Sequence, residues 1–128
     1  MKRFLAPALT LLAGVAIGAV VVQSLHAQTK MPGFYIAEIN VRNQDAYMKE
    51  FVPAAVKSLQ DAGGKFVVRG GNIVVTQGAA PAARIVVLQF PSIDRAQGWW
   101  NSQGQKEAQV IGDKYATFRS YIVEGLAP

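Results

Sequence analysis

Charged and polar side chains in predicted strands are the residues of this chain best suited to chemistry. If the strand registers agree, alternation puts four of them on one face of a sheet: Glu38, Arg69, Gln89 and Tyr121. There Arg69 could anchor an anionic or carbonyl group of a ligand, and Glu38 could act as a base. The structural alternative, which we favour, is an ion pair between Glu38 and Arg69 or contact of these groups with a second copy of the chain.

Adjacent tryptophans supply a second candidate. Trp99 and Trp100 lie on a predicted helix, where neighbouring side chains point about 100° apart, so both cannot face the core equally. We expect one to be core and the other to line a pocket or a dimer seam, and we keep Trp99 as a candidate ligand-binding residue. Tyr47, near the start of an earlier helix, is expected to pack.

Residues that are missing exclude several kinds of catalytic site. The chain has no cysteine, and its single histidine, His26, lies in a predicted signal segment. Thiol nucleophiles, disulfides, histidine-dependent triads, zinc sites of Cys and His, and histidine-ligated haem are therefore excluded from the mature domain. Asp45, Asp94 and Asp113 lie at predicted helix ends, where capping explains them. We predict no metal and no cofactor, which leaves carboxylate or tyrosine acid–base chemistry, or binding alone.

The N-terminus predicts export. Lys2 and Arg3 precede an apolar run over residues 4–22, and small residues end at Ala27, the order found in a secretory signal. We expect residues 1–27 to be a cleaved signal peptide and residues 28–33 to be a linker, with a periplasmic or secreted domain over residues 34–128. The alternative is an uncleaved membrane anchor, because the run is long enough to span a bilayer.

The charge of the chain is too small and too scattered for a nucleic-acid surface. The whole chain has a formal charge of +5, and removal of Lys2 and Arg3 leaves 11 basic and 8 acidic residues. Because the basic residues form no run, we predict no nucleic-acid partner.

Periodicity predicts four principal strands and two helical regions. We expect strands over residues 34–41, 65–69, 84–90 and 118–124. A helix capped by Asn43 should run to Gly63 with a kink near residues 51–52, because Pro53 interrupts it. A second helical region should begin at Ser92 and restart at Ser102, ending near residue 113. Residues 70–72 are predicted to turn tightly, residues 73–77 to return as a short hairpin arm, and residues 78–83 to form a loop.

This order is the split βαβ arrangement, a ferredoxin-like α+β fold with both helices on one face of a four-stranded sheet. Several strands are apolar on both sides, so the uncovered face should be buried by a second copy of the chain. The sequence therefore predicts a homodimer.

A resemblance to a known family rests on several segments in order: residues 34–41 (FYIAEINV), 63–71 (GGKFVVRGG), 86–92 (VVLQFPS), 96–102 (AQGWWNS) and 122–125 (IVEG). Together they resemble the domain-of-unknown-function family numbered 1330, of the dimeric α/β barrel superfamily. The resemblance covers essentially the whole mature chain and implies a fold and a homodimer, not an activity.

Three functions follow as hypotheses. The leading one is a small-molecule-binding dimer of the cell envelope, with the ligand in the barrel interior. The second is a cofactor-free isomerase or monooxygenase that acts on a small aromatic or carbonyl compound, using Arg69 with Glu38 or Tyr121. The third is an interaction module held by a retained anchor, the one case in which the membrane would be a partner.

Overall fold

The computed structural model describes residues 30–128, and residues 31–127 form one compact unit. The predicted signal peptide, residues 1–27, lies outside the described residues, as do residues 28 and 29 of the predicted linker. Over residues 30–128, no helix is both long enough and apolar enough to cross a membrane. The elements follow in the order β1 (Gly33–Val41), α2 (Gln44–Ala46), η1 (Tyr47–Phe51), α3 (Val52–Asp61), β2 (Lys65–Arg69), β3 (Arg84–Phe90), α4 (Ile93–Trp100), α5 (Gln103–Tyr115) and β4 (Ala116–Glu124).

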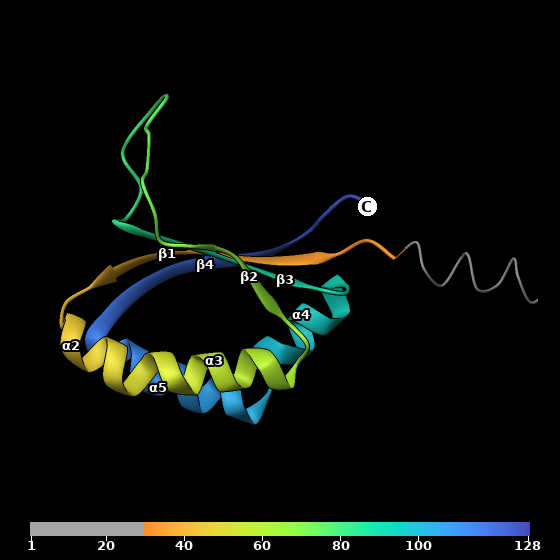
Figure 1. Cartoon of the computed structure of the whole chain (residues 1–128), viewed down its shortest axis with the longest axis horizontal. Helices are drawn as coiled ribbons and strands as arrows, with labels where there is room; N and C mark the ends of the chain where they lie inside the picture. The colour runs from red at the N-terminus through yellow and green to blue at the C-terminus, as the bar shows by residue number, and fades with distance from the viewer. Residues whose placement is uncertain (1–29) are drawn as a thin grey trace, which may run out of the picture. The chain divides into compact units, whose positions relative to one another are not determined.

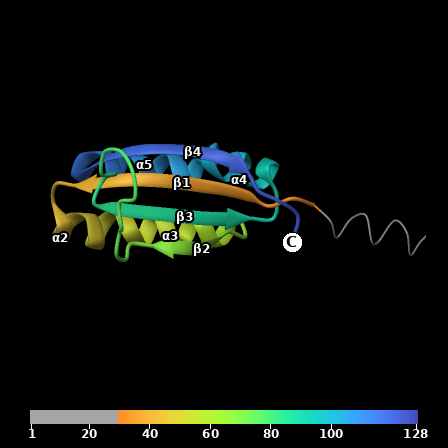
Figure 2. The same ribbon diagram turned by 90° about the horizontal axis from the view of Figure 1, so that it is seen from above.

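The four strands form one antiparallel sheet in the order β2-β3-β1-β4 (Figure 2). β1 lies between β3 and β4, which both come from the second half of the chain. This is the order that the split βαβ arrangement requires. The predicted α+β ferredoxin-like fold is confirmed.

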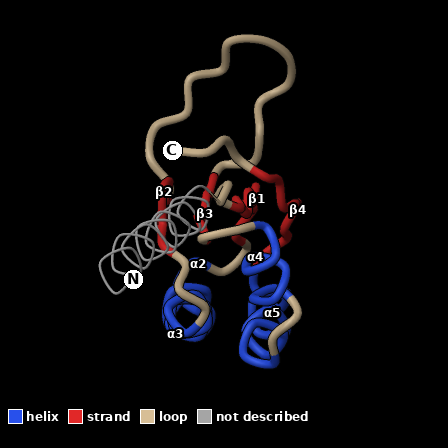
Figure 3. Tube along the Cα trace, turned by 90° about the vertical axis from the view of Figure 1, so that its right-hand side faces the viewer, coloured by secondary structure: helices blue, strands red, loops and turns tan. Residues whose placement is uncertain are grey.

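The helices of residues 30–128 all lie on one face of the sheet, with α3 beside α5 (Figures 1 and 3). Alternate residues of β1 face this layer and are buried, namely Tyr35, Ala37 and Ile39. Phe34 and Ile36 lie on the other face, which we call the open face, and are half-buried. The core therefore lies between the helices and the sheet, as the apolar alternation of β1 predicts.

The first helical region is irregular in the turn just before Pro53. Residues Tyr47–Phe51 form a π-helical segment, and the Val52 amide donates to the Tyr47 carbonyl, five residues back. Proline has no amide hydrogen and occupies the first turn of α3, where none is needed. The predicted irregularity near residues 51–52 is present as this change from π to α geometry.

Side-chain caps begin the helices where the sequence predicts them. The Asn43 Oδ1 atom accepts from the Ala46 amide at 3.1 Å, and the Ser92 Oγ atom accepts from the Arg95 amide at 3.2 Å. The Ser102 Oγ atom accepts from the Gln105 amide at 3.3 Å and begins α5. α5 runs to Tyr115, beyond the predicted end near residue 113, and β4 begins at the next residue.

The connection between β2 and β3 differs from the prediction. Residues 73–77 join no strand and do not return beside residues 65–69 as a hairpin arm. Instead, β2 pairs directly with β3, and residues 70–83 project from the sheet on the side away from the helices (Figure 1). We call residues 70–83 the arm.

Candidate functional site

The predicted site residues divide between the two faces of the sheet. Glu38, Gln89 and Tyr121 lie on the open face, opposite Arg119, Phe34 and Ile36 in the strand registers. Trp99 belongs to α4, and its side chain is buried between the helices and the sheet, only 3% exposed. Arg69 is on the helical face as well, so the expectation that four polar residues share the open face is wrong for Arg69.

A β-bulge explains the position of Arg69. In the pairing of β2 with β3, Phe66 lies opposite Leu88, but Val68 lies opposite Val87, so one extra residue is inserted in β2. Regular pairing would have put Arg69 opposite Ile85 on the open face. The bulge puts it opposite Val86 instead, because a shift of one residue exchanges the faces of a strand.

The predicted ion pair between Glu38 and Arg69 is also wrong. Glu38 pairs with Arg119, its neighbour across β1 and β4, and also accepts from the Ala82 amide at 3.1 Å. Its carboxylate therefore ties the end of the arm to the sheet. Gln89 and Tyr121 lie on opposite sides of β1, and Tyr121 is 49% exposed. The three open-face residues do not converge on one point.

A cavity of about 80 Å³ lies between the sheet and the helical layer. We call it the inner cavity. Its wall is rich in aromatic rings, contributed by strands and helices from along the whole domain: Tyr35, Tyr47, Phe51, Phe66, Trp99 and Phe118. Such an apolar wall with a few polar groups is typical of a small-molecule site.

Two arginines and a tyrosine are among the polar residues that line the inner cavity. The Arg84 guanidinium carbon lies 5.3 Å from the centre of the Tyr47 ring, and that of Arg69 lies 4.4 Å from the Phe66 ring. Arg69 is exposed and Arg84 is half-buried, so they mark the solvent side of the cavity. Among residues 30–128, neither arginine has a carboxylate partner within 4.0 Å, and no acidic residue lines the cavity.

Burial further stabilises the protonated form of the cavity tyrosines. It raises the pKa of Tyr47 above 10.0, although the charges of Arg84 and Arg69 act in the opposite direction. Burial also raises the pKa of Tyr35, which a hydrogen bond with Ser120 partly offsets. At neutral pH the Tyr47 hydroxyl is therefore a hydrogen-bond donor. In the part of the chain that the structure describes, no three His, Cys, Asp or Glu side chains group as metal ligands would.

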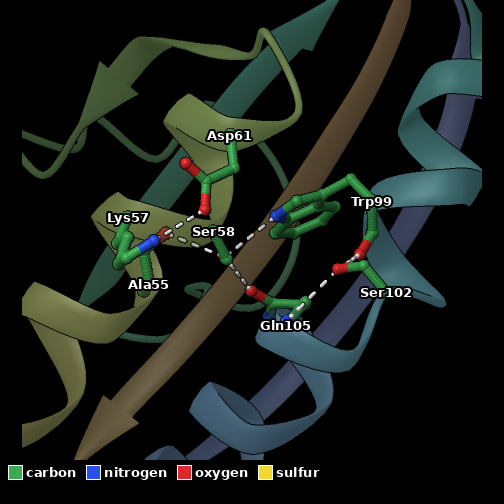
Figure 4. Close-up of polar contacts among 7 residues, drawn as sticks. All are labelled: Ala55, Lys57, Ser58, Asp61, Trp99, Ser102 and Gln105. Carbon is green, nitrogen blue, oxygen red and sulfur yellow. Dashed lines mark hydrogen bonds and ion pairs between the residues drawn. The ribbon is translucent and has the colours of Figure 1, made fainter.

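A buried polar network holds one wall of the cavity in place (Figure 4). The Ser58 hydroxyl accepts from the Trp99 indole at 3.2 Å and lies 2.7 Å from the Gln105 Oε1 atom, to which it donates. The Ser102 hydroxyl donates to the Trp99 carbonyl at 2.7 Å. These bonds connect α3, α4 and α5, so they fix the orientation of the indole that lines the inner cavity.

Sequence reasoning missed part of the site. Tyr47 does pack, as expected, but its ring also lines the cavity beside the two arginines. Arg84 and Gln105 also line the cavity and were not predicted. Arg84 carries a weak signal, because it is the one charge at the start of a mostly apolar strand. The bulge that turns Arg69 inward leaves no signal in the sequence. The ligand-binding role of Glu38 and the other four candidates stays a prediction.

Comparisons with known proteins give a family and a fold. The family model described as Domain of unknown function (DUF1330) matches residues 32–126. The methylated RPA0582 protein of Rhodopseudomonas palustris is similar in structure, with a TM-score of 0.59 and 17% identity over 86% of this chain and 92% of that chain. This likeness shows a shared fold.

Two further structures are more distant. SnoaB from Streptomyces nogalater, a cofactor-independent oxygenase, has a TM-score of 0.48 and 9% identity over 73% of this chain and 91% of that chain. A dimeric ferredoxin-like protein of unknown function from Thermobifida fusca has a TM-score of 0.40 and 13% identity over 73% and 92%. Neither likeness is close enough to bear on function. No functionally curated protein matches the sequence.

Proposed function

We propose that this chain, which belongs to the family Domain of unknown function (DUF1330), binds a small anionic aromatic molecule in its inner cavity. The observation that carries the proposal is the charge of the cavity lining, which holds two arginines and no acidic residue among the described residues. An anionic group would meet the guanidinium groups of Arg69 and Arg84 and the hydroxyl of Tyr47. The apolar part of the ligand would contact the aromatic wall.

The size of the inner cavity limits the ligand. Its volume of about 80 Å³ is well below the range of roughly 300–1,000 Å³ for pockets that hold drug-sized molecules. A ligand that enters without rearrangement is therefore close to a single ring in size. A larger one must displace exposed side chains at the cavity edge, such as Met48 and Arg69.

The test compares benzoate with its uncharged analogue benzamide by isothermal titration calorimetry. We expect benzoate to bind more tightly, and Arg84→Gln to weaken it by about 10- to 100-fold, because a hydrogen bond to a charged group contributes about 1.5–3 kcal/mol. Arg95→Gln is the matched control, since it removes an exposed guanidinium on α4 that does not line the inner cavity. Equal affinities for benzoate and benzamide, or an unaffected Arg84→Gln, would refute the assigned ligand class.

A second candidate function is proton-transfer catalysis without a cofactor. Glu38 and Tyr121 lie on the open face, so this candidate now depends on Tyr47, whose protonated hydroxyl could donate to a developing oxyanion beside Arg84. No carboxylate from the described residues lines the cavity to act as a base, which is why binding is the better supported function. Exchange of deuterium from the solvent into a small aryl ketone, lost in Tyr47→Phe and kept in Tyr121→Phe, would favour catalysis.

The protein is further proposed to work as a homodimer. The open face carries apolar side chains that the helices do not cover, and Tyr121 and Val123 are 49% and 44% exposed. A second copy would bury this surface. Analytical ultracentrifugation at micromolar concentration tests the proposal, and a well-folded monomer would refute it.

The protein is also proposed to be exported, with cleavage of its signal peptide. The order of charged, apolar and small residues before Gln28 supports a signal peptide. The intact mass of protein isolated from its native host tests this, because cleavage after Ala27 leaves a chain that begins at Gln28. An intact N-terminus in the membrane fraction would instead support the retained anchor.

A further inference from the structure

The arm is mostly apolar and exposed, and it contains no helix or strand. Residues 70–83 contain no charged residue, and residues 71–81 are all exposed. Its apolar side chains Ile73, Val74 and Val75 are 41%, 83% and 48% exposed. Charges normally protect such a segment from association, and here they are missing. The composition is that of a surface which another molecule covers.

Both ends of the arm are fixed to the sheet. The Gly70 amide donates to the Ile85 carbonyl at 2.9 Å, and the Ala82 amide donates to the Glu38 carboxylate at 3.1 Å. The ion pair of Glu38 with Arg119 holds that carboxylate in turn. The arm thus leaves the open face from a fixed base, and Figures 1 and 3 show it projecting away from the helices.

The two residues that flank the arm are the arginines of the inner cavity. Arg69 ends β2 immediately before the arm, and Arg84 begins β3 immediately after it. Their side chains reach the helical face while the arm projects from the open face. A contact that pulls on the arm therefore acts directly on the strand ends from which both guanidinium groups extend.

The length of the arm points to a second sheet stacked on the open face. Fully stretched, half of the arm reaches roughly 23 Å at about 3.3 Å per residue. Two sheets that pack face to face lie only about 10 Å apart. If a second sheet packed on the open face, an arm of this length would therefore reach past the inner surface of that second sheet.

A second copy of this chain fits that requirement best. In a two-fold symmetric pair each copy presents the same surface, here a partly apolar sheet face with an uncharged arm beside it. The arm of one copy then covers the partner's sheet while the partner's arm covers its own. Because the arm carries no charge, the arms of two copies do not repel each other.

We propose that the arm clasps a second copy of the chain and that this contact positions Arg69 and Arg84, so that the inner cavity reaches full affinity only in the dimer. This inference rests on the proposed function of the inner cavity. It assigns the arm both to the dimer interface and to the control of ligand binding.

The test uses the full mature chain with Val74→Asp, because Val74 is so exposed that the change cannot disturb the core. The matched control is Val110→Asp, at a 64% exposed position on α5 in the helical layer. Ultracentrifugation should show the dimer dissociation constant raised at least tenfold by Val74→Asp and unchanged by Val110→Asp. Benzoate affinity should fall in step with the dimer fraction of Val74→Asp and recover at high protein concentration.

Amide hydrogen exchange gives a readout that needs no ligand. Residues 68–70 and 83–85 should exchange faster in Val74→Asp than in the wild type, and at the wild-type rate in Val110→Asp. A monomeric wild type, a Val74→Asp variant that dimerises normally, or a monomeric variant with unchanged exchange at these residues would each overturn the inference. If the wild type does not bind benzoate, the proposed ligand class fails, while dimerisation and exchange still test the clasp.

Discussion

Ser58 is the centre of the buried network behind the inner cavity, and its replacement by alanine has a cost that the structure allows us to work out. Ser58, Trp99 and Gln105 are 6%, 3% and 3% exposed, so the hydroxyl that is lost lies in a largely buried environment. Ser58→Ala leaves the Trp99 indole N–H, which now donates at 3.2 Å, without its acceptor. Gln105 also loses a donor to its side-chain oxygen.

An unpaired buried donor costs about 1–3 kcal/mol. Alanine offsets part of this, because it is a better helix former than serine by up to about 0.5 kcal/mol. We therefore expect Ser58→Ala to lower the free energy of unfolding by about 1–2 kcal/mol. For a domain of this size each kcal/mol shifts the Tm by about 4–8 °C, so the Tm should fall by roughly 4–15 °C.

Urea unfolding followed by tryptophan fluorescence and circular dichroism measures the change. The midpoint should fall while the dependence on urea stays constant, because the network does not alter the surface that unfolding exposes. The control is a double-mutant cycle with Trp99→Phe, which removes the indole donor and keeps an aromatic ring. In that background Ser58→Ala should cost about 1 kcal/mol less than in the wild type, since no donor is left unpaired.

Two results would refute this reasoning. If Ser58→Ala is as stable as the wild type, the buried bonds contribute nothing measurable. If it costs the same with and without the indole N–H, the cost comes from another source, such as a change in packing at α3.

Three further predictions concern the rest of the domain. Gly112→Ala should destabilise it by about 1–3 kcal/mol in urea unfolding, because the new methyl would lie 2.7 Å from an aromatic carbon of η1. Gly98→Ala, also in a helix but with no atom within 4 Å, should stabilise it by about 0.5–1 kcal/mol, and the same sign for both would contradict the packing. Burial raises the pKa of Tyr35 and Tyr47, so their contribution to stability is complete below pH 10 and is lost as the pH rises through the raised values. Urea unfolding between pH 8 and pH 11 should show that loss, and Tyr47→Phe should reduce it. Arg119→Gln should cost less than about 1 kcal/mol, because this side chain is 76% exposed, and its cost should shrink further in high salt.

The sequence by itself determined the elements and their order. The alternating face of β1, the capping residues Asn43, Ser92 and Ser102, and the interruption before Pro53 are local signals, and each is present in the structure. Local signals suffice here because strand alternation and helix capping depend on neighbours within about four residues. The ferredoxin-like topology then follows from the order of the elements alone.

Only the tertiary structure decided which residues meet. One extra residue in β2 moves Arg69 from the open face to the inner cavity. Glu38 therefore forms its ion pair with Arg119, which lies opposite it in the pairing of β1 with β4. The arm likewise follows from the direct pairing of β2 with β3, which leaves residues 70–83 outside the sheet. The physical reason is that register depends on contacts between distant strands, and a shift of one residue exchanges the two faces without changing the local pattern of the sequence.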